Sequence, residues 1–214
     1  MNALTFQVWT FDVVVQPVHL LIVGYFALIA LQGGDIVAAL SIAGVVFGSI
    51  LWHELGHAAV CRRLRVRHGP IVLTGFGGYV AHEQTTPAKQ LLISLAGPAA
   101  MLVVGIPLAL CWDRGLVPDH PALQQLFGDL MLVNVGWGLL NLLPMLPLDG
   151  GNALRAGLGI VIEARRASLV AGGVGLLCGI GIAVLGATSG QLFVGLLGGF
   201  CAYQSWSAVS GGAR

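Results

Sequence analysis

Charged residues are scarce in this sequence. Asp, Glu, Lys and Arg make up 9% of its 214 residues, whereas 57% are hydrophobic and the mean hydropathy is +0.89. A soluble domain covers its surface with far more charge. The net charge of +1 provides neither a basic field for nucleic acid nor an acidic tail. The composition therefore predicts a small integral membrane protein that does not bind nucleic acid.

Three other features are missing. The 32 glycines follow no Gly-x-y period, which excludes a collagen. The four cysteines show no CxxC pairing and lie in or beside apolar segments, so we interpret them as packing residues. No Lys or Arg precedes the first apolar run, so we expect this run to be retained rather than cleaved as a signal peptide.

The sequence is rich in long apolar runs. A helix of about 20 consecutive apolar residues crosses the roughly 30 Å of hydrocarbon in a bilayer. Between the second and third runs, residues 66–86 combine β-branched residues with glycines, which predicts short strands around a glycine turn. We therefore expect an all-α polytopic membrane protein with about six transmembrane helices and a short membrane-associated β segment between helices two and three. The six predicted spans are residues 13–32, 36–61, 88–111, 122–146, 168–187 and 190–208.

Some residues near or within these spans allow further expectations. Residues 151–167 look like a helix at the membrane interface. His19 lies in an apolar span and is interpreted as a polar contact or a gate residue. Pairs of glycines four residues apart predict close helix contacts. These pairs are Gly44 with Gly48, Gly175 with Gly179, and Gly195 with Gly199.

Positive charge is unevenly divided between the two sides that the spans define. Arg114 is alone on one side, and the other nine basic residues share the opposite side. Because cytoplasmic loops are enriched in Lys and Arg, we expect both termini in the cytoplasm, as in a multi-pass protein of a bacterial inner membrane. The nine residues are Arg62, Arg63, Arg65, Arg67, Lys89, Arg155, Arg165, Arg166 and Arg214.

The second span ends in HELGHAAVCRR, which contains His53, Glu54 and His57. Residues four apart share one face of a helix, so the two imidazoles can hold one metal ion while Glu54 acts as a general base. The alternative is that the three residues only hydrogen-bond within a helical bundle. Ionisable groups inside a membrane are functional by default, which favours the metal site.

A catalytic zinc site needs a third protein ligand and an open position, and Asp149 is the candidate. It lies in NLLPMLPLDGG, residues 141–151, where two prolines stop the fourth span and two glycines allow a sharp turn. Span parity predicts that Asp149 lies at the same side of the bilayer as the histidines. Alternatively, Asp149 caps a helix that starts near Gly151, and another acid serves as ligand. The other acids considered are Glu83 and Glu163, in loops, and Asp129, near the opposite face.

The chain contains, in this order, HELGH at 53–57, FGG at 76–78, LAGP at 95–98 and NLLPMLPLDGG at 141–151. Together these four motifs resemble the site-2 protease family of intramembrane zinc metalloproteases, in a minimal form without a PDZ or CBS domain. The resemblance covers about residues 45–165. Where the family often has an asparagine, this chain has Met101, which removes a polar contact on the third span.

The resemblance implies one zinc ion per chain, bound by His53, His57 and Asp149, with Glu54 as the catalytic base. It also implies that Asn141 lies near the active site, where it binds the substrate backbone or the developing oxyanion.

The resemblance further implies that the strands around Gly77 and Gly78 offer an edge to an extended substrate. Substrates of such an enzyme are single-span membrane proteins, such as an anti-sigma factor, a membrane-bound transcription factor or a remnant signal peptide. We expect one membrane-embedded domain over residues 1–214, with a catalytic core at about 36–165 and additional C-terminal helices at about 168–208.

The predicted function is an intramembrane zinc endopeptidase that cleaves within or near transmembrane segments, as in regulated intramembrane proteolysis. One alternative is a catalytically idle adaptor or chaperone of the same fold that binds transmembrane segments. A transporter or channel would also place ionisable groups within the membrane, but it predicts inverted repeats, and none is seen in the sequence.

Overall fold

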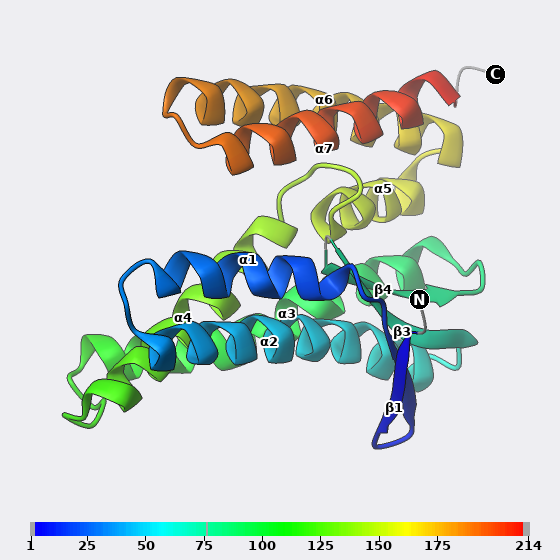
Figure 1. The fold of residues 1–214 in the computed structure, drawn as a ribbon. Coiled ribbons are helices and arrows are strands. Elements are labelled where there is room, and N and C mark those ends of the chain that lie inside the picture. The colour runs from blue at the N-terminus through cyan, green and yellow to red at the C-terminus, as the bar shows by residue number, and fades with distance from the viewer. Residues whose placement is uncertain (1–2, 76, 212–214) are drawn as a thin grey trace. The chain divides into compact units, whose positions relative to one another are not determined.

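A computed structural model describes residues 3–75 and 77–211, most of which are helical (Figure 1). Phe76 of the FGG motif and Arg214 of the charge count lie outside these residues. The chain divides into two compact units, residues 1–84 with 96–139 and residues 85–95 with 140–214. The single domain predicted for residues 1–214 stays a prediction.

The first unit contains a four-stranded sheet with the order β1-β2-β3-β4. β2 pairs antiparallel with β1 and parallel with β3, and β3 pairs antiparallel with β4. β3 and β4 confirm the β segment predicted between the second and third spans. The strands are β1 (Leu4–Val8), β2 (Phe11–Val15), β3 (His68–Thr74) and β4 (Gly77–His82).

The first predicted span was wrong at its start, because residues 13–15 belong to β2. Phe11, Val13 and Val15 are buried while Asp12 between them is exposed, which is the alternation of a half-buried strand. The helix α1 (His19–Leu31) begins only after this strand. The β-branched valines favour the extended backbone, so the apolar run contains a strand and a shorter helix.

α1 and α2 (Ile36–Arg63) lie side by side in the first unit (Figure 1). Asp35 caps the N-terminus of α2 by accepting hydrogen bonds from two backbone N–H groups. The N-terminal half of α2 packs on α4 (Pro121–Asn141) through polar pairs. Ser41 donates to Asp129, and Asn134 donates to Ser49. Such interhelical hydrogen bonds stabilise helix contacts inside membranes.

α3 (Pro87–Asp113) contacts the C-terminal half of α2. The indole of Trp52 donates to the carbonyl oxygen of Ala100 over 2.8 Å. A Cβ on Gly56 would lie 2.6 Å from the carbonyl oxygen of Ala96, so the two helix backbones approach closely here. The division between the units falls inside α3 and near the end of α4.

The second unit contains α5 (Asp149–Val161), α6 (Ala164–Thr188) and α7 (Leu192–Gly211). The helix predicted at 151–167 is thus α5 together with the start of α6, and its place at a membrane interface stays a prediction. α6 and α7 pack along each other. A Cβ on Gly179 would lie 2.7 Å from the backbone nitrogen of Ala202, and one on Gly175 would lie 2.5 Å from Oγ of Ser205. The predicted close contact is confirmed for this glycine pair.

The same prediction was wrong for Gly44 and Gly48, where a Cβ would meet no described atom within 4 Å. In the third pair a close contact is present only at Gly195, because a Cβ on Gly186 of the facing helix would lie 2.6 Å from Cα of Gly195, whereas a Cβ on Gly199 would meet no described atom within 4 Å. GxxxG spacing permits close approach but does not cause it, because the helix must also have a partner on that face.

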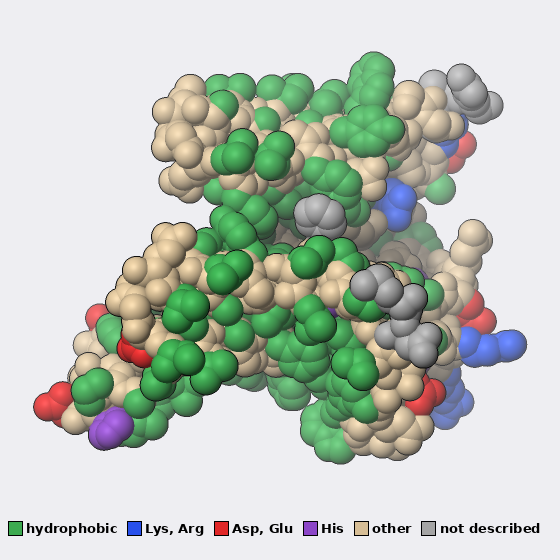
Figure 2. All heavy atoms as spheres, viewed as in Figure 1, with side chains coloured by type: hydrophobic (Ala, Val, Ile, Leu, Met, Phe, Trp, Pro, Cys, Tyr) green, Lys and Arg blue, Asp and Glu red, His purple; other side chains and the backbone are tan. Residues whose placement is uncertain are grey.

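Four described helices are long and apolar enough to cross a membrane: α2, α3, α6 and α7. α1 is a shorter apolar helix, and α4 is not among the four. Hydrophobic side chains cover much of the visible surface of the helices (Figure 2), as expected where lipid rather than water surrounds them. All six predicted spans thus contain a helix, while the number that crosses the bilayer stays a prediction.

Candidate metal centre

α2 directs two imidazole rings toward one point. Nε2 of His53 and Nε2 of His57 lie 3.1 Å apart, and both side chains are buried. The helix produces this pairing directly, because residues i and i+4 stand one turn apart on the same face. Two imidazole ligands of a tetrahedral zinc ion, each about 2.0–2.1 Å from the metal, have nitrogens about 3.3 Å apart. The separation and the donor type therefore fit a shared zinc ion.

Gly97 of α3 lies directly over this histidine pair. A Cβ at this position would overlap Nε2 of His57 and would lie 2.6 Å from Nε2 of His53. Any side chain at position 97 would therefore fill the space in front of the two nitrogens. Gly97 belongs to the LAGP motif, which carries part of the family resemblance. No role in the metal site was predicted for this motif. A glycine beside Pro98 inside a helix is costly for helix stability, and this cost was the available signal.

Glu54 lies under the strand β4. Its side chain is buried, with 2% of its surface exposed. A Cβ on Gly78 would lie 2.6 Å from Cγ and 2.8 Å from Oε1 of Glu54, so β4 passes directly against the carboxylate. The neighbouring Gly77 has φ +124°, in the region that favours glycine. The first unit thus brings together His53, Glu54, His57 and the strand residue Gly78.

β4 has a second edge. Within residues 3–75 and 77–211, β4 pairs only with β3, so its other edge has no strand partner there. Unpaired backbone N–H and C=O groups at a sheet edge can bind another extended chain. Gly77 and Gly78 are the first two residues of this edge strand. Their role in substrate binding stays a prediction.

Asn141 and Asp149 belong to the second unit. Asn141 is the last residue of α4, and Asp149 is the first residue of α5 and is half-buried. The prolines at 144 and 147 fall in the connection between these helices, as predicted. The roles of both residues stay predictions.

The alternative role of Asp149 as a helix cap was wrong. α5 begins at Asp149 itself, and Leu148 is the N-cap residue. Gly150 and Gly151 are helical rather than part of a sharp turn. A Cβ on Gly150 would overlap the carbonyl group of Leu142, and one on Gly151 would lie 2.5 Å from the carbonyl carbon of Met145. The two glycines instead let the preceding connection pack against the first turn of α5.

His19 is a buried polar contact. Its Nδ1 lies 2.7 Å from the carbonyl oxygen of Thr74, and its ring meets Phe47 edge-on at 5.6 Å between centroids. The hydrogen bond ties the beginning of α1 to the end of β3, which fits the first of the two interpretations of this histidine.

Comparison with known proteins places these observations in a family. Residues 41–113 match Peptidase family M50. The chain is 31% identical over 134 residues to a zinc metalloprotease of Methanocaldococcus jannaschii, an alignment that covers 61% of this chain and 38% of that protein. It is 34% identical over 175 residues to Rip3, a candidate zinc metalloprotease of Mycobacterium tuberculosis, an alignment that covers 74% of this chain and 43% of that protein. The chain matches less than half the length of these relatives.

A solved structure extends the likeness to the whole fold. The chain is similar to the site-2 protease from Methanocaldococcus jannaschii with a TM-score of 0.69, over 97% of this chain and 95% of that chain, at 22% sequence identity. At this identity the match shows the fold. The family match, the zinc metalloprotease relatives and the fold agree with the motifs, so the chain carries a domain of Peptidase family M50, the site-2 protease family.

Proposed function

We propose that this protein is an intramembrane zinc endopeptidase that hydrolyses peptide bonds within or near transmembrane segments of membrane-anchored substrates. The observation that carries the proposal is the buried pair of His53 and His57, with their Nε2 atoms 3.1 Å apart and the Glu54 carboxylate beside them on the same helix. Glycines on α3 and β4 keep the space in front of these groups free of side chains.

In this proposal His53 and His57 hold one zinc ion, and a carboxylate oxygen of Asp149 is the third ligand. Two imidazoles and one carboxylate are a known ligand set of catalytic zinc, which leaves one position open. When bound, the zinc ion supplies a Lewis acid that polarises the peptide carbonyl and increases the acidity of water. The support for Asp149 is its residue type and its place in the family motif.

Glu54 is the proposed general base. Its carboxylate accepts a proton from the attacking water and then donates it to the amine that leaves. The close passage of Gly78 restricts where the Glu54 side chain can lie. A base held in one orientation transfers protons more efficiently than a mobile one.

The substrate binds along the free edge of β4, beginning at Gly77 and Gly78. Peptide bonds of a transmembrane helix are protected by their own hydrogen bonds, so the substrate must unwind before cleavage. Pairing with an edge strand replaces the hydrogen bonds that unwinding removes. The amide of Asn141 donates to the substrate backbone or to the oxyanion that develops during attack.

The proposal also includes the membrane in which the enzyme lies, its orientation and its substrate class. With the basic loops in the cytoplasm, the active site opens toward the cytoplasm in a bacterial inner membrane. The substrate class is a single-span membrane protein, such as an anti-sigma factor, a membrane-bound transcription factor or a remnant signal peptide, as the family resemblance implies.

The test uses the purified full chain, with zinc content and cleavage of a single-span reporter measured on the same samples. Glu54→Gln should retain one zinc ion per chain while cleavage falls at least about 100-fold, the usual contribution of a general base. His53→Ala should lose both zinc and cleavage. His120→Ala, at an exposed histidine between α3 and α4, is the matched control and should change neither.

Two outcomes would contradict the proposal. Wild-type protein that holds zinc but cleaves no faster than Glu54→Gln would favour the idle adaptor or chaperone. Wild-type protein that cleaves equally well after complete removal of metal would exclude a zinc mechanism.

A further inference from the structure

A basic pocket lies where α2 ends, apart from the histidine pair. It is shallow and wide open, with a volume of about 450 Å³, and is lined by Arg62, Arg65, Val66, Arg67 and His68. Three of these five residues carry a permanent positive charge. Figure 2 shows Lys and Arg side chains gathered at the end of the first unit where the strands lie. The sequence alone indicated a basic cluster here but not a pocket.

The positive charge of this pocket is only partly neutralised. Nε of Arg67 lies 3.6 Å from Oε2 of Glu83, and this pair is exposed to solvent. Arg62 donates a hydrogen bond to the neutral hydroxyl of Thr10. The guanidinium group of Arg65 makes no hydrogen bond or ion pair with any described residue. Three guanidinium groups therefore face one carboxylate, which leaves charge available for an anion.

The backbone at Arg65 indicates that the arginine is not there for the fold. Arg65 has φ 55°, the left-handed conformation, which glycine adopts without strain. It closes α2 in a Schellman motif, because the N–H of Val66 bonds to the carbonyl of Cys61 and the N–H of Arg65 bonds to that of Arg62. Glycine is the usual residue at this position of the motif. The sequence instead has a long cationic side chain, and that side chain lines the pocket.

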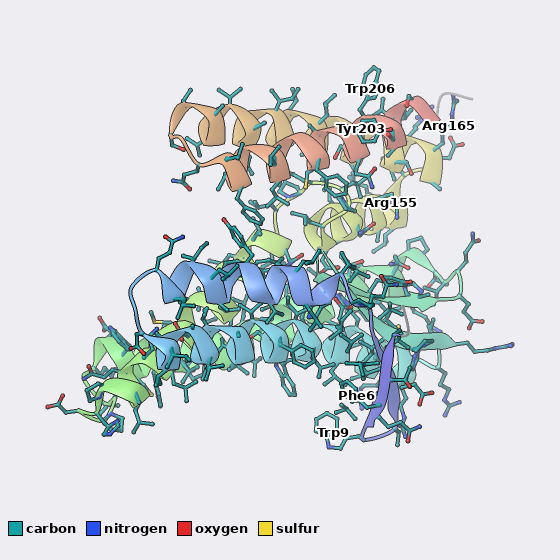
Figure 3. The ribbon with its side chains drawn as sticks, in the orientation of Figure 1. Phe6, Trp9, Arg155, Arg165, Tyr203 and Trp206 are labelled. Carbon is teal, nitrogen blue, oxygen red and sulfur yellow. The ribbon has the colours of Figure 1, made fainter. Side chains whose placement is uncertain are left out.

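The hairpin of β1 and β2 lies beside the pocket and exposes an apolar face. Arg62 connects the two, because it bonds Thr10 at the hairpin turn and its guanidinium lies 5.9 Å from the centre of the Phe11 ring. Leu4 and Phe6 lie opposite Val15 and Val13 in the strand register but remain exposed. Trp9, at the turn, is 73% exposed. Phe6 and Trp9 lie at the free end of this hairpin (Figure 3).

Exposed aromatic side chains next to arginines that outnumber their carboxylate partners are the arrangement found at the headgroup level of a membrane. α2 is long and apolar enough to span the bilayer, and the pocket begins at its last turn, where headgroups lie. We propose that the pocket binds the phosphate group of an anionic phospholipid. Arg62 and Arg65 contact the phosphate oxygens, and Trp9 and Phe6 enter the interface beside the lipid.

This proposal differs from the simpler role of the arginines as a topology anchor. An anchor depends on the total charge near the membrane, so each arginine of the cluster counts equally. A pocket depends on the residues that line it. Arg63 lies between two lining residues in the chain and is exposed, but it does not line the pocket. It therefore provides a matched control. The proposal does not depend on protease activity, and its test measures binding alone.

The test titrates the purified full chain in neutral detergent by calorimetry. The probes are dihexanoyl phosphatidylglycerol, dihexanoyl phosphatidylcholine and inorganic phosphate. Wild-type protein should bind phosphatidylglycerol more tightly than phosphatidylcholine, and added salt should weaken this binding. Arg65→Gln should weaken phosphatidylglycerol binding about fivefold, the contribution of one basic residue near an anionic lipid surface. Arg63→Gln should leave it unchanged.

Two further variants test whether Arg65 serves the fold or the ligand, and whether the bound phosphate belongs to a lipid or is free. Arg65→Gly should match or exceed the thermal stability of the wild type, because glycine suits φ 55°, yet lose the same affinity as Arg65→Gln. Trp9→Ala should weaken phosphatidylglycerol binding and leave inorganic phosphate binding unchanged. Equal losses from Arg63→Gln and Arg65→Gln would show an anchor rather than a site. Inorganic phosphate binding as tight as that of phosphatidylglycerol would assign the pocket to free phosphate and overturn the lipid.

Discussion

The glycines beside the histidine pair in the first unit and those between α6 and α7 in the second unit serve different purposes. In the first unit, the atoms nearest to Gly97 and Gly78 belong to the side chains of His53, His57 and Glu54. In the second unit, a Cβ on Gly179 or Gly186 would meet the backbone of the facing helix. Beside the histidine pair and Glu54, glycine thus keeps space free for chemical groups, whereas Gly179 and Gly186, like Gly56 in the first unit, let two helices touch. The neighbouring atoms, rather than the spacing of the glycines, distinguish these roles.

The largest effect that follows from this comparison is expected at Gly97. In Gly97→Ala, the methyl group would overlap the imidazole nitrogens, so the protein should lose zinc and all measurable cleavage. Metal analysis of the purified variant checks this directly. Gly136→Ala is the matched control, because a Cβ there would meet no described atom within 4 Å and the protein should keep its zinc. A Gly97→Ala protein with a full complement of zinc would show that the glycine only serves helix packing.

Gly78→Ala should have a smaller effect on the same site. The methyl group would press on Cγ of Glu54, a flexible side chain that can move aside while the histidines stay in place. Zinc content should therefore be unchanged, and cleavage should fall about 10- to 100-fold because the base is displaced. Parallel zinc and rate measurements test this separation. Loss of zinc together with activity would mean that β4 supports the whole site and not the base alone.

The smallest effect on activity is expected from Gly186→Ala in the second unit. Its methyl group would lie 2.6 Å from Cα of Gly195, so α6 and α7 must separate, at a cost of about 1–3 kcal/mol. Thermal unfolding should shift to lower temperature while zinc content stays at the wild-type value. Gly181→Ala on the same helix has open space and should not be destabilised. If Gly186→Ala lost zinc without losing stability, the proposed division between the two roles of glycine would be wrong.

The part of the candidate site that could be predicted from the sequence depends on local geometry. The pairing of His53 with His57 follows from the periodicity of a single helix, and the strands at 68–82 follow from β-branched residues around glycines. The contacts of Gly78 and Gly97 depend on which elements pack together. No local pattern states that a given glycine faces an imidazole rather than lipid.

The hairpin β1–β2 was missed for a related reason. Only Gln16 and Pro17 separate Val13, Val14 and Val15 from the apolar residues that lead into α1, so residues 13–32 still satisfy the length of a membrane span. The partner that holds this segment extended is β3, whose Ile71 pairs with Val13 across more than fifty residues of chain. The alternation of Phe11, Asp12 and Val13 was visible, but it is too short to outweigh the hydropathy of the longer run.

The parallel pairing of β2 with β3 also sets an order of events during synthesis. The two strands are separated along the chain by α1 and α2, and α2 is a candidate membrane span. β2 leaves the ribosome early, but it has no partner on this side until residues 68–74 have followed. α2, which precedes this partner in the chain, therefore also leaves the ribosome before it. The sheet that covers Glu54 can thus be completed only after α2, the helix that carries Glu54, has been synthesised in full, so the candidate site assembles late relative to its own first strand.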